Sequence, residues 1–476
     1  MLIHRFCRQL PIAPNSPLIR KLYSTESRAS SALRKDEARS STRQLFVTGA
    51  AAAATAAATA LPSSSGSERR LVRVDLEELA PSLSAQIAHG QVEPVAVSAG
   101  WKHAAITLKE LHHQKYYIVM SGLNESMQLG CPRNDENIQR NLIPCPHGKQ
   151  PISIACGREH TAVVLQDIST KRTELFTFGR NSFGQLANGI NKADGLLQYE
   201  WNSDRPIQFT DRVFARSVAC GLDHTVVLGN NGKAYTAGWN ADGQLGRTSD
   251  DSLHATCRPF PVGVEGHSLD TGVLSERNIR KITCSADTTL ALTEDGSLFA
   301  WGNSEYGQAM LGSKIDRVSQ PVKVDTLSHS VVDIAAGSTG SLVLCDDGNV
   351  YGCGYGPIGT RRDDVDYNPA DSRTPPMVLR PRKVIGLPSG MKANSIHAGF
   401  GYYGAVLDNK QLWLWGINDS FNRLGTHKPR DTHGHPLHCD TPTKLDFGSV
   451  HNEDIKCIDS VGFGGNAMYL IASLFN

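Results

Sequence analysis

The chain has 476 residues, of which 40% are hydrophobic and 20% are charged, as is ordinary for a globular protein that folds in water. Its 44 glycines and only 7 methionines indicate many turns and few long helices, which argues against an all-helical fold. The net charge of +1 conceals an uneven distribution of charge along the chain.

The first 43 residues differ in charge from the rest of the chain. They hold nine of the 48 Lys and Arg residues but only three of the 47 acids, which leaves 39 bases and 44 acids in residues 44–476. Four apolar residues among the first ten share one side of a notional helix. An amphipathic, Arg- and Ser-rich, acid-poor start is typical of a mitochondrial transit peptide. We predict a transit peptide and flexible N-terminus over residues 1–43, cleaved near Tyr23 or somewhat later; a disordered basic tail is the alternative.

Residues 44–62 read QLFVTGAAAAATAAATALP and carry no charge. Leu45, Phe46, Val47 and Leu61 are the residues that favour lipid, while Ala, Thr and Gly add almost nothing. We therefore predict no membrane-spanning helix here or elsewhere. The alanines are interpreted as a loop or short helix of the folded body, with a second targeting spacer as the alternative.

One phrase recurs along the chain, with a glycine followed three residues later by a histidine or its replacement. Examples are VSAGWKHAAITL (97–108) and IACGREHTAVVL (154–165), and the mean step between copies is about 60 residues. Seven copies align on Gly100, Gly157, Gly221, Ser285, Gly337, Gly399 and Gly462.

A second phrase, such as ELFTFGRNSFGQLANG (174–189), lies between the copies of the first but occurs only six times after residue 97. QLFVTG at 44–49 supplies the seventh copy. The chain thus begins with the second half of a repeat and ends with the first half. Such an arrangement closes a ring, because N-terminal strands complete the C-terminal blade and leave no unpaired edge.

Both phrases have the chemistry of β-strands, with short runs of Val, Ile and Leu joined by hairpin signals such as Asn231-Gly232 and Asp295-Gly296. Four short strands in each repeat, seven times over, predict an all-β, seven-bladed β-propeller over residues 44–476. We expect it to be closed by N-terminal strands that pair in the C-terminal blade.

Several chemical motifs have simpler structural readings. GxGxxG at 354–359 is followed by charge and proline rather than by an amphipathic helix, so these glycines are interpreted as repeat glycines and not as a nucleotide site. His433, His435, His438 and Cys439 lack the spacing of a structural zinc site and are interpreted as a polar surface loop.

The recurring histidines and cysteines also favour structural roles. His103, His160 and His224 occupy the same place in successive repeats, which indicates hydrogen-bonded packing rather than catalysis. The recurring cysteines, Cys156 among them, lie in hydrophobic stretches without CxxC pairs and are interpreted as buried thiols. The tryptophans at 239, 301, 413 and 415 are interpreted as blade core or edge. No set of catalytic residues can be singled out, so we predict no enzyme chemistry of the chain's own and no cofactor or metal.

The paired signatures GxxH(T/S)xxL and GxNxxGQLG, seen in GLDHTVVL (221–228) and GWNADGQLG (238–246), resemble those of the regulator of chromosome condensation repeat family. The match covers about residues 44–476. The transit-like start, WGNSEYGQ and the degenerate GYGPIGT are most similar to the family's mitochondrial member, an exchange factor-like protein. The chain departs from the pattern where Thr288, Gly340, Tyr402 and Gly465 replace the repeat histidine, so the last four blades are expected to pack or act differently.

The resemblance implies a guanine nucleotide exchange factor for a mitochondrial dynamin-like GTPase that drives inner-membrane fusion. It also implies an alternative role, a scaffold in mitochondrial ribosome biogenesis that binds large-subunit rRNA or its assembly and pseudouridylation factors. The acidic body argues against direct RNA contact, and no DNA partner is expected. The implied location is the mitochondrial matrix or the inner membrane, with peripheral membrane association left open.

Partner contacts are expected where the repeat is interrupted, because loops on a rigid scaffold commonly bind partners. Residues 360–383 form such an interruption in the fifth blade, and 187–217 and 247–278 are other long connections. A solvated linker is the alternative for each. The predicted partner-binding residues are Arg361, Arg362, Asp363, Asp364, Arg380, Arg382 and Lys383.

Overall fold

The computed structural model of the chain describes most of the residues from 41 onwards. The described residues are 41–48, 71–134, 139–189, 198–207, 209, 213–247, 255–261, 274, 277–361, 363–366, 377–408, 410–418, 422–425, 438–447, 454–465 and 467–475. The alanine run and the predicted transit peptide lie outside these residues.

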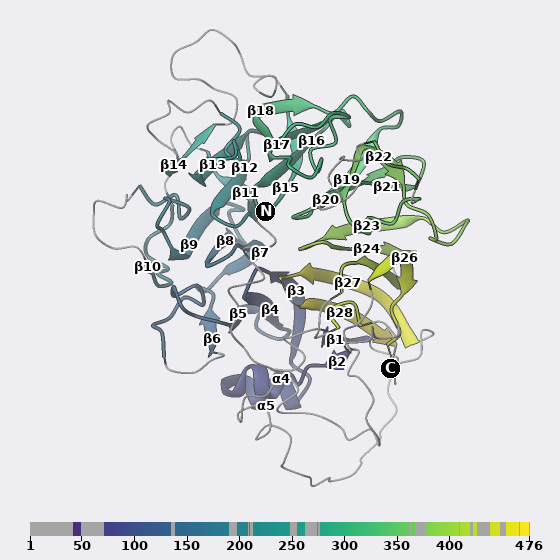
Figure 1. Ribbon diagram of the computed structural model, residues 1–476. Coiled ribbons are helices and arrows are strands. Elements are labelled where there is room, and N and C mark those ends of the chain that lie inside the picture. The colour runs from purple at the N-terminus through teal and green to yellow at the C-terminus, as the bar shows by residue number, and fades with distance from the viewer. Residues whose placement is uncertain are drawn as a thin grey trace, which may run out of the picture.

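Seven four-stranded antiparallel sheets are arranged around a common centre (Figure 1), which confirms the predicted propeller. Each blade is given from its inner to its outer strand. Blade 1 contains β3 (Val92–Ala99), β4 (His103–Glu110), β5 (Lys115–Gly122) and β6 (Gln139–Pro144), and blade 2 contains β7 (Lys149–Cys156), β8 (His160–Asp167), β9 (Thr173–Arg180) and β10 (Gln198–Tyr199). Blade 3 contains β11 (Ala215–Cys220), β12 (His224–Gly229), β13 (Ala234–Trp239) and β14 (Ala255–Pro261), and blade 4 contains β15 (Ile279–Ser285), β16 (Thr288–Thr293), β17 (Leu298–Asn303) and β18 (Arg317–Lys323). Blades 5 to 7 contain β19 (Val331–Ala336), β20 (Gly340–Cys345), β21 (Val350–Tyr355), β22 (Met377–Lys383); β23 (Ala393–Ala398), β24 (Tyr402–Leu407), β25 (Gln411–Gly416), β26 (Cys439–Lys444); β27 (Ile455–Phe463), β28 (Met468–Phe475), β1 (Ser41–Val47), β2 (Val72–Arg73).

The seventh blade joins the two ends of the described chain. All seven residues of β1 pair with β28, from Ser41 opposite Phe475 to Val47 opposite Tyr469. The side chain of Phe46 is only 3% exposed, so the strand belongs to the core. This pairing confirms the predicted closure, and β1 begins three residues before the expected Gln44.

The alignment of the last repeat was wrong by two residues. Gly100 N–H donates to the carbonyl of His103, and the matching bond in blade 7 runs from Gly464 to Ala467 rather than from Gly462 to Gly465. The physical reason lies in β27, whose pairing with β28 shifts register twice, whereas the first strand of each other blade shifts once. The extra irregularity moves the turn along the sequence.

The hydrophobic core lies between neighbouring blades. Trp301 and Trp415 are fully buried, as predicted for blade core, and Trp301 Nε1 donates to the carbonyl of Gln244 in the preceding blade at 3.0 Å. Trp239 and Trp413 are only partly buried.

Short helices lie at the rim between blades 7 and 1, comprising α4 (Leu76–Leu79), η2 (Pro81–Leu83) and α5 (Ser84–Ala88). Within the described chain, no helix has both the length and the apolar character needed to cross a membrane.

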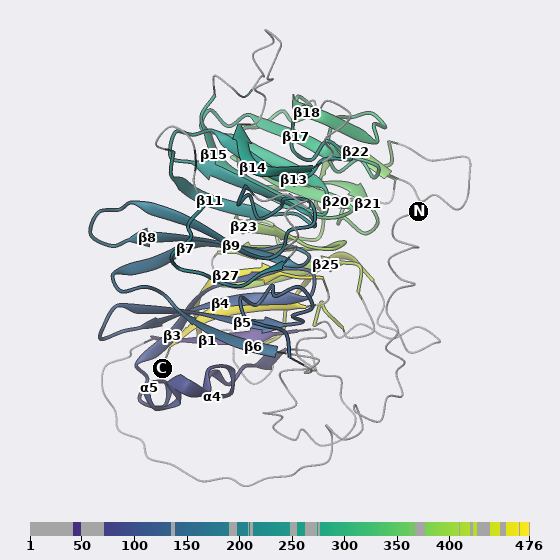
Figure 2. The ribbon, with the colours of Figure 1, turned by 90° about the vertical axis from the view of Figure 1, so that its left-hand side faces the viewer.

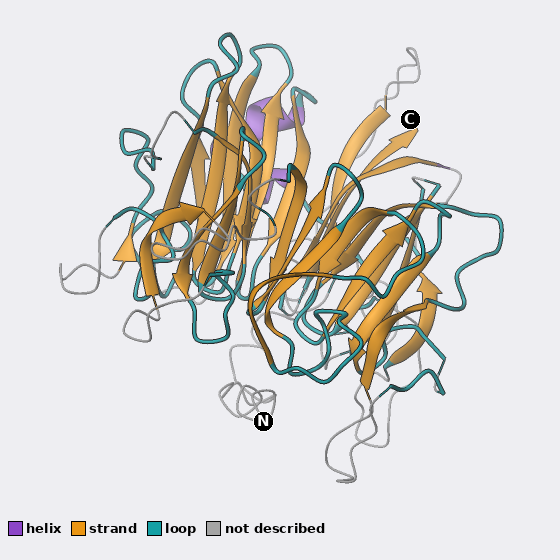
Figure 3. Cartoon of the chain, turned by 90° about the horizontal axis from the view of Figure 1, so that it is seen from above, coloured by secondary structure: helices purple, strands orange, loops and turns teal. Residues whose placement is uncertain are grey.

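The two faces of the disk carry different connections. We call the face with the turns between first and second strands and the loops between third and fourth strands the loop face. The other face, called the hairpin face, carries the second-to-third-strand hairpins and the connections between blades. In Figures 2 and 3, α5 and the C-terminus lie together on the hairpin-face side. The hairpin signals behave as predicted; Gly232, for example, takes a φ of 73°.

Candidate partner-binding site

The repeat histidines join neighbouring blades on the loop face. His160 Nε2 lies 3.1 Å from the Thr225 hydroxyl of the next blade, and that hydroxyl donates to the carbonyl of Gln185 at 2.7 Å. Because the threonine proton is used for the carbonyl, Nε2 must carry the histidine proton and donate it. The same relay links His103 to Thr161 and His224 to Thr289.

Burial keeps these histidines neutral. It lowers the pKa of His103 to about 4 and that of His160 and His224 to about 3. A Cβ added to Gly157 would lie 2.2 Å from Cε1 of His160, so the GxxH spacing exists to make room for the ring. These contacts confirm the predicted packing role.

Replacing His160 by alanine should lower the free energy of unfolding by about 2–4 kcal/mol at pH 7.5, because it leaves a cavity and breaks the link between blades. The unfolded chain binds more protons than the folded chain between pH 3 and the ordinary histidine pKa of 6.5. The histidine's contribution is therefore complete above pH 6.5 and is lost as the pH falls. Urea titrations at several pH values measure both effects, and a variant as stable as the parent at pH 7.5 would contradict them.

Where the histidine is missing, other side chains join the blades. The Tyr402 hydroxyl donates towards the carbonyls of Gly464 and Ala467, at 2.8 and 2.9 Å, and so bridges blades 6 and 7. The guanidinium of Arg423 lies 4.7 Å from the centre of the Tyr402 ring. Thr48 donates to the carbonyl of Arg423 at 2.5 Å, so the closing joint is packed differently, as expected.

The residue before the histidine position is acidic in three successive blades. These carboxylates, Glu159, Asp223 and Asp287, form what we call the acidic arc. Each interacts across a blade boundary, since Gln185 Nε2 donates to Asp223 at 3.4 Å and Gln244 Nε2 donates to Asp287 at 2.8 Å. At Glu159 the donor from the preceding blade is the Ser126 hydroxyl, at 3.0 Å.

Two arginines accompany the acidic arc. Arg180 pairs with Glu159 at 2.8 Å, and Arg158 pairs with Asp223 of the next blade. Burial opposes the charge of Glu159, but the hydrogen bonds from Arg180 and Ser126 outweigh it and hold its pKa below the ordinary value. Burial lowers the pKa of Arg158, while Glu159 acts in the opposite direction.

Asp287 is the exception in the acidic arc, because no ion pair in the described part of the chain neutralises it. Burial raises its pKa to about 6, and the nearby charge of Asp242 acts in the same direction. A cationic group of a partner would stabilise the ionised form of the Asp287 carboxylate, since an opposite charge favours ionisation.

The variant Asp287→Asn should be about 1–2 kcal/mol more stable than the parent at pH 7.5, because the amide keeps an acceptor for Gln244 and removes a costly charge. The expected gain in stability is small because the Asp287 side chain retains some contact with water. The folded chain binds the extra proton between pH 4 and 6, so the advantage should shrink towards pH 5. Parallel urea titrations at pH 5 and pH 7.5 test this, and an equal advantage at both values would contradict it.

An aromatic pair lies across the centre from the acidic arc. Trp101 of blade 1 and Phe400 of blade 6 meet edge to face with ring centres 4.4 Å apart. A Cβ on Gly465 would lie 2.5 Å from the Trp101 carbonyl, so blade 7 makes room for the contact. The loop face thus presents carboxylates on one side of its centre and partly exposed aromatic rings on the other. Aromatic rings are enriched in interfaces that bind proteins.

The predicted partner-binding residues lie in blade 5, away from the acidic arc. Arg361, Asp363, Arg380 and Lys383 are exposed, while Asp364 and Arg382 are partly buried and Arg362 lies outside the described residues.

Asp366 ties the base of this loop together. Its carboxylate accepts from Leu379 N–H and Arg380 N–H at 2.9 Å and from the Arg382 guanidinium at 2.8 Å. Burial opposes the charge of Asp366, but the backbone hydrogen bonds outweigh it and keep its pKa low. Arg382 is therefore partly neutralised, and the loop is anchored rather than open along its length.

Two other motifs receive structural explanations. Gly354 lies opposite Gly340, and a Cβ there would come within 2.3 Å of the Gly340 Cα, which supports its interpretation as a repeat glycine. His438 accepts from Asn418 N–H at 3.1 Å. Cys439 is fully buried at the start of β26, so its assignment to a surface loop was wrong; it pairs with Gly416 inside the sheet. His433 and His435 lie outside the described residues.

Nine cysteines, Cys156 among them, are free thiols, and burial raises the pKa of Cys156 to about 12. Among the described residues no three His, Cys, Asp or Glu side chains gather as a metal site would require.

The family comparison identifies the repeat. The model of the regulator of chromosome condensation (RCC1) repeat matches residues 174–228, 231–292 and 295–344, and a second model of the same repeat matches 215–244 and 279–308. Each match of the first model runs from the third strand of one blade to the second strand of the next. The chain therefore carries RCC1 repeats, which confirms the resemblance.

Curated relatives include exchange factor-like proteins, a receptor and a GTPase regulator. The chain is 30% identical to the human RCC1-like G exchanging factor-like protein over 317 residues, which cover 62% of each chain. It is 29% identical to the ultraviolet-B receptor UVR8 of Arabidopsis thaliana, over 62% of this chain and 60% of the receptor. The alignments thus span about three fifths of the length of these relatives.

Solved structures share the fold. Human WBSCR16 superposes with a TM-score of 0.69 at 22% identity, covering 90% of this chain and 99% of that one. Prp20p from Saccharomyces cerevisiae, whose structure was described together with its binding to Gsp1p and histones, gives a TM-score of 0.69 at 20% identity, with 91% and 92% covered.

Proposed function

From the premise that this chain is a closed seven-bladed propeller of RCC1 repeats, we propose that it is a guanine nucleotide exchange factor whose loop face binds a partner GTPase. The observation that carries the proposal is the acidic arc on one side of the centre of that face, with the aromatic pair on the other. The description of the relatives as exchange factor-like proteins supports the same activity.

The acidic arc suggests how exchange would work. Carboxylates repel the phosphates of a bound nucleotide and attract the Lys and Mg²⁺ that hold those phosphates. A face with this charge favours the nucleotide-free GTPase over the loaded form. By linkage, it lowers the affinity of the GTPase for nucleotide by the same factor. The propeller needs no catalytic residue of its own for this activity.

We propose a mitochondrial dynamin-like GTPase of the inner-membrane fusion machinery as the partner, with the propeller in the matrix or at the inner membrane. The support is the transit-like composition of residues 1–43 and the similarity to the exchange factor-like relatives.

The test mixes the purified chain with that GTPase loaded with a fluorescent GDP analogue and follows release in excess GTP. Catalytic amounts of the chain should accelerate release at least tenfold. The same assay with a small GTPase separates the activity from the choice of partner. If the chain accelerates nucleotide release only from the small GTPase, the exchange activity is supported and the dynamin-like partner is excluded. No acceleration of either would remove the proposal.

The alternative role, a scaffold that binds large-subunit rRNA or its assembly and pseudouridylation factors, draws less support from the described residues. Arg382, in the interruption of the repeat at residues 360–383, forms an ion pair with Asp366, and acids outnumber bases in residues 44–476. Crosslinking in mitochondria measures it directly. Recovery of large-subunit rRNA that is lost on replacing Arg361, Arg380 and Lys383 by Ala would favour the scaffold.

A further inference from the structure

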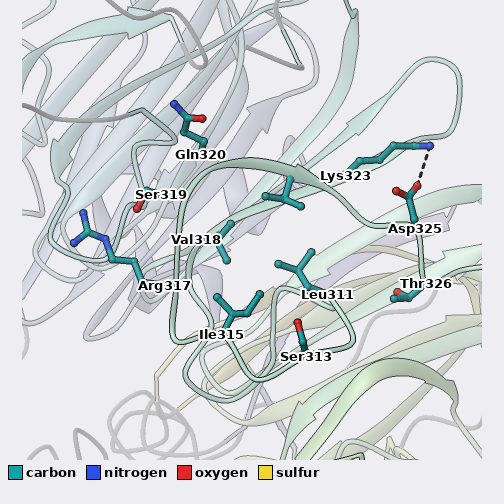
Figure 4. Close-up of a pocket in the computed structure, with 11 residues that line it drawn as sticks. Leu311, Ser313, Ile315, Arg317, Val318, Ser319, Gln320, Lys323, Asp325 and Thr326 are labelled. Carbon is teal, nitrogen blue, oxygen red and sulfur yellow. Dashed lines mark ion pairs between the residues drawn. The ribbon is translucent and has the colours of Figure 1, made fainter. Parts of the chain in front are cut away.

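The outer rim of blade 4 carries a groove beside β18. It encloses about 680 Å³ between β18 and the loop that precedes it (Figure 4). Its apolar lining includes Leu311, Ile315, Val318 and Val322. Ile315 and Val322 are 38% and 42% exposed, unusual values for β-branched residues that share one concave surface.

The charges around the groove are not balanced. Lys323 pairs with Asp325 at 2.9 Å, as the dashed line in Figure 4 shows, and Lys314 pairs with Asp316. Arg317, at the other end of the groove in Figure 4, has no ion-pair partner among the described residues.

Arg380 of blade 5 brings a second unpaired charge to the opposite end of the groove, near Thr326. A Cβ on Gly312, in the loop between Leu311 and Ser313, would lie 3.0 Å from Nε of Arg380. Arg380 is exposed and forms no ion pair within the described part of the chain. The groove therefore offers two free guanidinium groups next to an apolar floor.

The apolar lining and the two unpaired arginines together indicate which kind of molecule the groove could bind. Among the described residues no aromatic ring lines the groove, so the stacking surface that single-stranded nucleic acids use is missing from this part of the chain. A second copy placed symmetrically would bring the positive groups of one copy towards those of the other. The basic residues 1–43 carry the wrong sign of charge. A guanidinium binds a carboxylate through two parallel hydrogen bonds, so a peptide with acidic side chains fits a groove with an unpaired arginine at each end.

We propose that this groove binds a short acidic peptide segment of a partner protein, with apolar side chains on Ile315 and Val322, one carboxylate at Arg317 and another at Arg380 at the opposite end. The site lies on the rim, separate from the acidic arc, so the propeller would hold a second protein while its loop face is occupied.

A random seven-residue peptide display library, selected against the purified full chain, tests the proposal. Peptides that combine Asp or Glu with apolar residues should be enriched. A synthetic copy of the most enriched peptide should bind at least tenfold more weakly, by fluorescence anisotropy, to the variants Arg317→Glu and Arg380→Glu. Val322→Asp should also weaken binding, whereas Arg216→Glu, an exposed change in β11, should not.

Charge exchange provides the sharpest outcome. The same peptide with its acids replaced by lysine should bind the parent at least tenfold more weakly and recover affinity for the variant with both Arg317→Glu and Arg380→Glu. Enrichment of no peptide, enrichment without acids, or equal binding to that variant would overturn the proposal. Tight binding of a uridine octamer sensitive to the same changes, or a dimer in sedimentation that Arg317→Glu dissociates, would overturn it in favour of RNA or of a second copy.

Discussion

A chain that begins at residue 49, and so lacks β1, should fail to form a cooperatively folded propeller. The loss removes Leu45, Phe46 and Val47 from the core, at about 1.5–3 kcal/mol for each buried side chain. It also strips seven pairing positions from β28 and leaves that strand as an open edge next to β27, which invites aggregation. The three side chains together account for about 4.5–9 kcal/mol, which is comparable to the 5–15 kcal/mol that ordinarily stabilises a folded domain. The broken joint at Thr48 adds to that loss.

The matched control is a chain that begins at Ser41 and keeps β1 whole. It should unfold in a single steep transition in urea, with the same midpoint as a chain that carries the natural start. Circular dichroism and sedimentation velocity distinguish the two truncations. A monomeric, cooperatively unfolding product that begins at residue 49 would show that the ring does not depend on its first strand.

Neutralising the acidic arc should abolish most of the exchange activity. The triple variant Glu159→Gln, Asp223→Asn and Asp287→Asn keeps the size and the hydrogen-bond acceptors of each side chain while removing three charges. Because the proposed preference for the nucleotide-free GTPase depends on those charges, kcat/KM for exchange, measured with the fluorescent GDP analogue, should fall at least 100-fold, which is about 2.7 kcal/mol of barrier. Affinity for the nucleotide-free GTPase should weaken in parallel.

The control variant removes three exposed charges from the hairpin face: Glu294→Gln, Asp346→Asn and Asp408→Asn. It alters net charge by the same amount, so any loss that arises only from long-range electrostatics would appear in both variants. Full exchange activity in the acidic-arc variant would contradict the proposed site, provided that the parent is active. Urea titration of both variants separates lost binding from lost folding.

The fold could be predicted because the repeat period and the hairpin residues of the sequence all indicate the same closed propeller. The period of about 60 residues sets the number of blades, and hairpin residues such as Gly232 terminate the strands. The assignment of the seventh copy to 44–49 followed from counting half-repeats. The exception is the last turn, where glycines at 462, 464 and 465 offered alternative alignments and only the register of β27 decides among them.

The candidate site was less accessible from the sequence. The acids at 159, 223 and 287 each precede the histidine position of their repeat, a signal that was present in the phrases REH, LDH and ADT. Taken singly, an acid in a tight turn indicates only a solvated residue. Their role emerges when the blades set them side by side with Gln185, Gln244 and the arginines.

The aromatic pair could not be found from spacing at all. Trp101 and Phe400 belong to blades that flank the seventh blade, and they meet only because the ring closes and Gly465 leaves room between them. The interruption of the repeat at 360–383 pointed to exposed charges such as Arg380. The sequence did not reveal that this arginine lies against the rim of blade 4.

Disulfide trapping of the closing strand gives the most direct test of the ring. Arg43 and Ser473 lie directly opposite each other in β1 and β28. The bond from Thr48 N–H to the Met468 carbonyl places them at a non-hydrogen-bonded position, where Cα atoms are about 4.5 Å apart and cysteines can join. Gln44, one residue along, directs its side chain to the other face of the sheet and serves as the control.

In the folded chain, the pair Arg43→Cys and Ser473→Cys should form a disulfide under mild oxidation, identified by mass spectrometry of the linked peptides. The pair Gln44→Cys and Ser473→Cys should not. Efficient linkage of the first pair alone would place the first strand of the chain beside its last. Absence of linkage in a folded protein, or equal linkage of both pairs, would contradict the closed ring on which the loop-face site depends.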